Sequence, residues 1–167
     1  MMRLIHSYVG PGSEHTNLTA ETTLNNGSAS IAAGGAVLGK RFRWTGGVRC
    51  TSTNSTDTLA IKLKLGGTAV YSPSAVDVAD NDILVWDLEL VPRTAAGSTS
   101  GAILVSGRAS VLAASGTGTM REVYALVSSL DLTAAIALIV TGTWSVASAS
   151  NQVHVSHMAL YEIVSEA

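Results

Sequence analysis

Large aliphatic side chains alternate with small or charged residues over much of this chain, and a period of two is typical of β-strands with one buried face. Residues 59–65 show it most plainly, with leucine or isoleucine at every odd position and alanine or lysine between them. The same alternation recurs in 83–91, 103–111 and 136–146. A helix would need apolar residues three and four positions apart, so these segments predict strands.

The segments between the predicted strands carry turn signals. Gly66-Gly67 directly follows the first run, and a Gly-Gly pair supplies the positive φ angles of a tight hairpin. Small residues in 95–101 and 115–119 predict further loops. The segment 130–137 is the one candidate for a helix, and we interpret it as a turn at most. Eight to ten strands with turns every 8–12 residues are typical of an all-β fold. The sequence therefore predicts an antiparallel two-sheet sandwich of the jelly-roll type, with an extended N-terminal arm.

The last predicted strand changes the side on which its apolar residues fall. Val153 and Val155 share one parity, whereas Met158 and Leu160 have the other. One extra residue near 156–157 would return all four side chains to one face, which is the effect of a β-bulge. We therefore expect a bulge there.

The chain divides into an arm, residues 1–35, and a jelly-roll domain, residues 36–167. Glycine and asparagine interrupt the arm, and its short apolar runs are too small for a core of their own. We expect the arm to bind a partner, because its apolar side chains would otherwise stay in water. A flexible tail is the alternative. The expected partner-binding residues are Leu4, Ile5, Tyr8, Val9, Leu18 and Leu24.

Composition excludes several classes of protein. The formal net charge is −2 and only 13% of the residues are charged, so a basic nucleic-acid-binding surface is not expected. The longest apolar run, 134–140, is far shorter than a membrane span, and no secretory signal is recognised near the N-terminus. Synthesis in a cytoplasm without membrane insertion is the expectation. The single cysteine, Cys50, forms no internal disulfide and is expected to be buried.

No catalytic, metal or cofactor site is predicted. Asp77, Asp80 and Asp82 lack the spacing of a calcium loop and are interpreted as turn residues. His154 and His157 form a His-x-x-His pair without an evident third zinc ligand. The chain also lacks a Gly-x-Ser-x-Gly motif, so we expect a protein that is not an enzyme.

The exposure of the tryptophans distinguishes a structural subunit from a glycan-binding one, because a glycan-binding jelly roll usually stacks an exposed aromatic ring against the sugar. Trp86 and Trp144 have the apolar parity of their strands and are expected in the core. Trp44 precedes Gly46-Gly47, and it is the one tryptophan that we leave as a possible ligand-exposed aromatic.

Four segments together resemble a known kind of domain. They are Gly39-Lys40-Arg41-Phe42-Arg43, the hairpin segment 57–68, the strand 82–94, and Thr143-Trp144-Ser145 followed by Asn151-Gln152-Val153. Over about three quarters of the chain, this pattern resembles the jelly-roll domain of tailed-bacteriophage virion structural proteins. The resemblance implies a capsid decoration or cement protein, a head-fibre base or a tail accessory protein.

We favour a non-enzymatic decoration protein that binds the outer capsid surface and stabilises the head. Its expected partners are the major capsid protein and copies of itself, as a homotrimer, without nucleic acid, membrane or cofactor. Its expected location is the capsid surface of a virion made in the host cytoplasm. A tail or fibre domain that binds host surface glycans is the alternative. A secreted bacterial lectin is a third possibility, disfavoured because no secretion signal is recognised.

Overall fold

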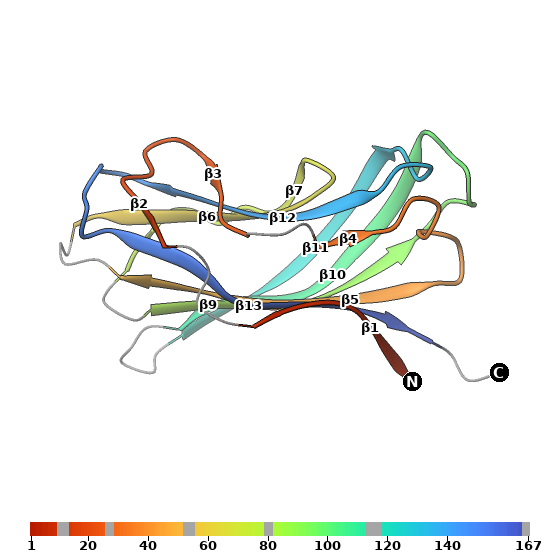
Figure 1. The fold of residues 1–167 in the computed structure, drawn as a ribbon, viewed down its shortest axis with the longest axis horizontal. Coiled ribbons are helices and arrows are strands. Elements are labelled where there is room, and N and C mark those ends of the chain that lie inside the picture. Colours follow the sequence, from red (N-terminus) through yellow and green to blue (C-terminus); the bar gives the residue numbers. More distant parts are fainter. Residues whose placement is uncertain (10–13, 26–28, 52–55, 79–81, 113–117, 165–167) are drawn as a thin grey trace.

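The computed structural model describes residues 1–9, 14–25, 29–51, 56–78, 82–112 and 118–164. Within these residues the chain forms thirteen strands and no helix, and every strand pairing is antiparallel. The strands lie in two layers, which are the lower and upper sheets in Figure 1.

The lower layer is a seven-stranded sheet. Its strands follow the order β1 (Met2–Val9), β13 (Gln152–Ile163), β5 (Arg41–Thr51), β9 (Asp82–Pro92), β10 (Gly101–Leu112) and β11 (Gly118–Leu130), and β2 (His15–Thr16) also pairs with β13. In this order β1 and β11 are the two edge strands of the seven-stranded sheet.

The upper layer is a six-stranded sheet. Its order is β3 (Thr22–Thr23), β12 (Ile136–Trp144), β6 (Thr58–Leu65) and β7 (Thr68–Tyr71), while β4 (Ser30–Ile31) pairs with β12 and β8 (Val76–Asp77) pairs with β6. The chain passes between the layers after β2, β4, β5, β8, β11 and β12. This arrangement confirms the predicted antiparallel two-sheet sandwich.

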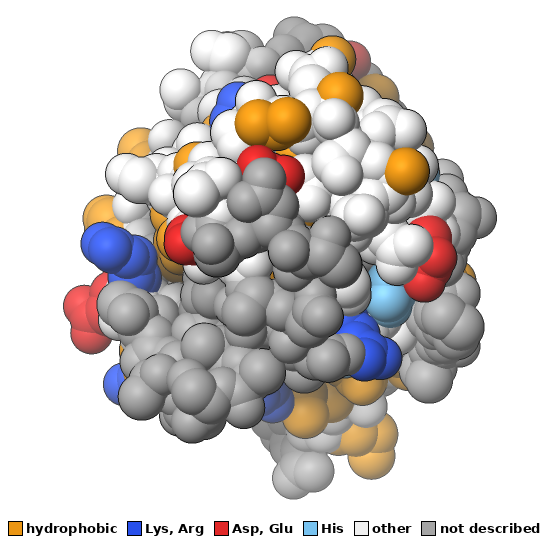
Figure 2. All heavy atoms as spheres, turned by 90° about the vertical axis from the view of Figure 1, so that its left-hand side faces the viewer, with side chains coloured by type: hydrophobic (Ala, Val, Ile, Leu, Met, Phe, Trp, Pro, Cys, Tyr) orange, Lys and Arg blue, Asp and Glu red, His pale blue; other side chains and the backbone are white. Residues whose placement is uncertain are grey.

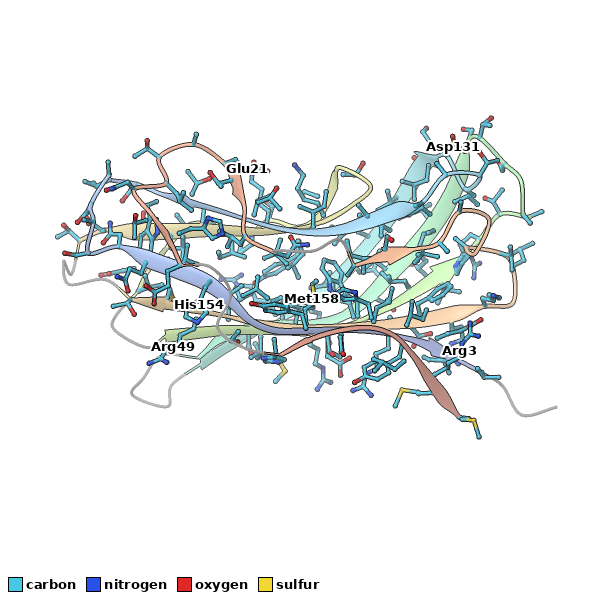
Figure 3. The ribbon with its side chains drawn as sticks, viewed as in Figure 1. Arg3, Glu21, Arg49, Asp131, His154 and Met158 are labelled. Carbon is cyan, nitrogen blue, oxygen red and sulfur yellow. The ribbon has the colours of Figure 1, made fainter. Side chains whose placement is uncertain are left out.

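The core lies between the two sheets and contains the apolar faces that the alternation predicts. Leu63, Leu88 and Val140 are completely buried, and Trp144 is 1% exposed. Figure 3 shows Met158 between the layers, and its exposed fraction is 2%. The prediction for Cys50 is also confirmed, because its side chain is 4% exposed.

The predicted hairpin turn and the predicted β-bulge are both present. Gly66 and Gly67 connect β6 to β7 with φ angles of +56° and +94°. The register between β13 and β5 shifts between Val155 and His157, which places the expected bulge at Ser156. The bulge lets Val155 and Met158 both point into the core.

The arm was expected to bind a partner with its apolar side chains, but part of the arm packs in the core of its own chain. Leu24 is completely buried and Ile31 is 1% exposed, both within the core of their own chain. Strand β12 is paired with β6 on one side, and β3 and β4 cover its other side. Gly142 in β12 has no side chain, and a Cβ there would lie 3.0 Å from the nearest methyl group of Leu24. The arm thus completes the six-stranded sheet instead of leaving the domain.

Polar contacts also hold the arm. The Asn25 side chain accepts a hydrogen bond from the amide of Val140 and donates one to the carbonyl of Leu138. Glu21 accepts hydrogen bonds from the ammonium groups of Lys62 and Lys64, at 2.6 and 2.9 Å. At the start of the chain, Arg3 and Lys40 both form ion pairs with the carboxylate of Glu162.

Candidate ligand-binding face

The face of the seven-stranded sheet that points away from the six-stranded sheet is called the outer face here. Cross-strand partners form rows across it. One row, from β1 to β11, is Leu4, Tyr161, Arg43, Glu89, Ser106 and Tyr124. The next row, from β13 to β11, is Ala159, Thr45, Asp87, Arg108 and Glu122. These two rows bring together charged, hydroxyl and aromatic side chains from six strands.

Two adjoining hollows lie over the middle of the outer face. The first has a volume of about 530 Å³ and the second about 380 Å³. Asp87 and Arg108 line both of them. The first is also lined by Met2, Arg43, Glu89, Ser106, Gly107 and Ile163, and the second by Thr45, Gly46, Val85, Trp86, Ser110, Met120 and His157. Together the hollows reach from β1 to β11.

A glycine in the first hollow allows two of its strands to approach each other closely. At Gly107, φ is +149°, and a Cβ there would lie 2.2 Å from the carbonyl oxygen of Asp87. No other residue type fits this close approach between β10 and β9 without a shift of the backbone. Gly47 faces His157, and a Cβ on Gly47 would lie 2.6 Å from Cε1 of that imidazole.

Ion pairs fix the charged side chains of the outer face. Nε and Nη2 of Arg43 donate to the two carboxylate oxygens of Asp87, at 2.7 and 2.5 Å. These bonds hold the pKa of Asp87 below its usual value and raise the pKa of Arg43. Arg41 donates to Glu89 at 2.5 Å, which raises the pKa of Arg41. The Asp87 carboxylate is therefore ionised and oriented at neutral pH, and the hydrogen bond from Arg41 orients the carboxylate of Glu89.

Arg108 differs from these two arginines. It is exposed, and it forms no hydrogen bond or ion pair with any residue that the structure describes. Its cross-strand neighbours are Asp87 and Glu122. Its guanidinium donors are available at the point where the two hollows meet.

The two histidines predicted as a non-metal pair lie on this same face. Because of the bulge, His154 pairs with Arg49 and His157 with Gly47, both in β5. Figure 3 shows His154 and Arg49 at one end of the seven-stranded sheet. Burial lowers the pKa of His154, an effect that nearby Glu14 opposes.

No group of three or more histidine, cysteine, aspartate or glutamate side chains in the described part of the chain has the geometry to hold a metal ion. Asp77 is exposed. Asp80 and the side chain of Asp82 lie outside the described residues, so the interpretation of this acidic segment stays a prediction. The described residues also contain no helix long and apolar enough to cross a membrane.

The arm residues that were expected to bind a partner differ in how exposed they are. Leu4 and Ile5 are 52% and 39% exposed, so they remain available. Tyr8 and Leu18 are partly buried against the core of their own chain. Leu24 is completely buried, so its assignment to a partner is wrong. The side chain of Val9 lies outside the described residues.

The interpretation of Trp44 as a possible ligand-exposed aromatic is also wrong, because Trp44 is 0% exposed. Its ring lies 5.7 Å from that of Trp86, at an interplanar angle of 70°. The exposed aromatic of the outer face is Tyr124, at 78%, which the sequence reasoning missed. Its signal was the segment 120–127, where both parities contain apolar residues.

Comparison with known proteins adds the following. No protein-family model matches the chain, and no curated protein matches it. Among solved structures, the chain is similar to peanut lectin with a nine-residue peptide, with a TM-score of 0.35 and 7% identity over 100% of this chain and 92% of that one. It is also similar to a chain of infectious bursal disease virus, Gt strain, with a TM-score of 0.32 and 13% identity. That match covers 98% of this chain but only 32% of the viral one, so this chain spans about a third of its length. The fold itself, an antiparallel two-sheet β-sandwich, follows from the strand order of the two sheets.

Proposed function

We propose that this protein is a non-enzymatic structural protein of a tailed-phage virion, and specifically a decoration protein on the outer capsid surface. Its partners are then the major capsid protein and copies of itself, in a homotrimer. The observation that carries the proposal is the character of the two edge strands of the seven-stranded sheet. Both have a free side among the described strands, and both carry exposed large apolar side chains.

The edge strands have the properties of docking elements. An edge strand presents unpaired N–H and C=O groups, which a neighbouring protein can pair by adding a strand. On β1, Met2 and Leu4 are 51% and 52% exposed. On β11, Met120 and Leu126 are both 62% exposed. A protein that worked alone in solution would be expected to cover or charge such edges.

The low charge of the chain suits large permanent contacts. Only 13% of the residues are charged, so few ions must lose their water when a surface is covered. Figure 2 shows the described surface at one end of the sandwich, where uncharged polar groups and backbone predominate and the charged side chains are scattered.

The test is reassembly on particles that lack the protein. Virions of the phage that encodes this chain are produced without it, incubated with purified protein and sedimented. We expect the wild-type protein to sediment with the particles, and L4K and L126K to lose most of this binding. L38K is the matched control, because the exposed fraction of Leu38, 57%, lies between those of Leu4 and Leu126, but Leu38 lies in a loop before β5.

Two results would contradict the proposal. One is a failure of the wild-type protein to bind the particles. The other is electron microscopy that places the bound protein only on the tail, which would favour the alternative of a tail or fibre domain. Sedimentation equilibrium of the free protein tests the homotrimer separately.

A further inference from the structure

We propose that the two hollows of the outer face form a binding site for a neutral oligosaccharide. This inference goes beyond capsid attachment, which is assigned to the edge strands and does not require the middle of the sheet. It rests on four features of the outer face: its shape, its paired donors and acceptors, its exposed aromatic ring and its balanced charge.

The shape suits an extended, flexible ligand better than a compact one. The first hollow is lined by Met2 of β1 at one end and by Ser106 of β10 at the other. These strands are four strand spacings apart, which is about 19 Å at about 4.8 Å per spacing. The middle of the depression stays open because several of its lining residues are small, namely Thr45, Ser106, Gly107 and Ser110.

The polar groups match the chemistry of a hydroxyl, which both donates and accepts hydrogen bonds. Asp87 and Glu89 offer carboxylate acceptors that Arg43 and Arg41 hold in place. Arg108 offers donors that no described residue uses. Because the ion pairs fix the two carboxylates in advance, these side chains would lose little conformational freedom when a ligand binds.

Tyr124 supplies an apolar surface beside the polar groups. It is the cross-strand neighbour of Ser106, which lines the first hollow, and it is 78% exposed. A sugar ring presents C–H groups on one face and hydroxyls at its edge. The phenol ring can cover the former while Arg108 and Asp87 bind the latter.

The charges argue for a neutral ligand. Arg41, Arg43 and Arg108 carry three positive charges, and Asp87, Glu89 and Glu122 carry three negative charges in the same two rows or directly beside them. The field over the hollows is therefore balanced. An acidic chain would gain nothing from net charge and would meet three carboxylates.

The experiment measures binding of the full chain to neutral hexasaccharides of glucose, mannose, galactose and N-acetylglucosamine by calorimetry, with hyaluronan and polygalacturonate hexamers as acidic probes. We expect millimolar or tighter binding of at least one neutral probe. Substitutions Y124S and R108A should each weaken that binding at least about tenfold.

Two variants are the matched controls. Leu126 is exposed on the same strand and face as Tyr124, so L126S tests whether any exposed apolar residue of β11 matters. Arg93 is exposed but lines neither hollow, so R93A tests whether any arginine matters. Both should bind as the wild type does.

Amide chemical shifts of the wild-type protein give a readout without any substitution. Titration with the binding probe should shift the amides of Ser106, Gly107 and Arg108. Absence of binding to every neutral probe, binding to acidic probes alone, or binding that leaves these amides and both test variants unaffected would overturn the inference. None of these outcomes bears on capsid binding, which is measured with the edge-strand variants.

Discussion

The ring of Trp86 occupies the place that a side chain at position 46 would take: a Cβ on Gly46 would lie 2.2 Å from Cζ2 of Trp86. The two residues are cross-strand partners in β5 and β9. G46A should therefore force the indole or the strand to move, at a cost of about 1–3 kcal/mol or more in the free energy of unfolding.

A double-mutant cycle checks that contact by urea denaturation. W86L shortens the side chain that meets position 46, so G46A should cost less in the W86L background than in the wild type. G97A is the control, because a Cβ on Gly97 would have nothing within 4 Å. Its cost in the free energy of unfolding then comes only from the backbone, where φ is +78°. Equal effects of G46A in both backgrounds would contradict the contact.

Truncation of Trp144 should destabilise the fold, because this side chain lies in the core and is 1% exposed. W144A should lower the free energy of unfolding by about 3–5 kcal/mol, the range for a buried aromatic side chain. Its indole N–H is buried without an acceptor among the described residues. W144F removes that donor and keeps most of the volume, so its cost should be clearly smaller.

Leu24 tests whether the arm belongs to the fold of its own chain. L24A should cost about 2–5 kcal/mol, because the side chain is completely buried beside Gly142 and Ile61. L4A should change stability by less than about 0.5 kcal/mol, since Leu4 is on the exposed edge. Deletion of residues 2–34 should lower the melting temperature strongly, and an unchanged melting temperature would contradict the structure.

Glu21 makes part of the stability dependent on pH. Hydrogen bonds from Lys62 and Lys64 lower the pKa of Glu21 from 4.5 to about 2. Because the folded-state pKa is the lower one, this contribution is complete above pH 4.5 and is lost as the pH falls toward 2. E21Q should lower the melting temperature at pH 7 but not near pH 2.

The size of that effect is modest, since exposed ion pairs contribute at most about 1 kcal/mol. E122Q is the control: Glu122 is also exposed and forms no ion pair among the described side chains. Thermal melting from pH 7 to pH 2 gives both curves. A difference between E21Q and wild type that grows as the pH falls would contradict the assignment.

The sequence predicts the strands well because alternation is a local property. Odd residues of 59–65 are buried and even ones are not, as their pattern requires. The bulge at Ser156 is predictable for the same reason, because a change of parity in one strand needs an extra residue.

Positions that depend on a second strand are not predictable in this way. Trp44 packs edge to face against the ring of Trp86, and Gly46, on the strand beside that of Trp86, leaves the space that this ring fills. Leu24 is buried because Gly142, more than a hundred residues away, leaves room for it. The rows of the outer face depend likewise on the order of six strands in the sheet, and no local pattern in the sequence predicts that order.

The beginning and end of the described chain exchange backbone hydrogen bonds. The amino group of Met1 donates to the carbonyl of Val164 at 3.1 Å, and the amide of Val164 donates to the carbonyl of Met1 at 2.8 Å. A short linker could therefore close the polypeptide into a ring without disturbing any strand pair. A circular permutant with new ends in the exposed turn at Gly97 would keep both sheets, because Met1 and Val164 lie side by side.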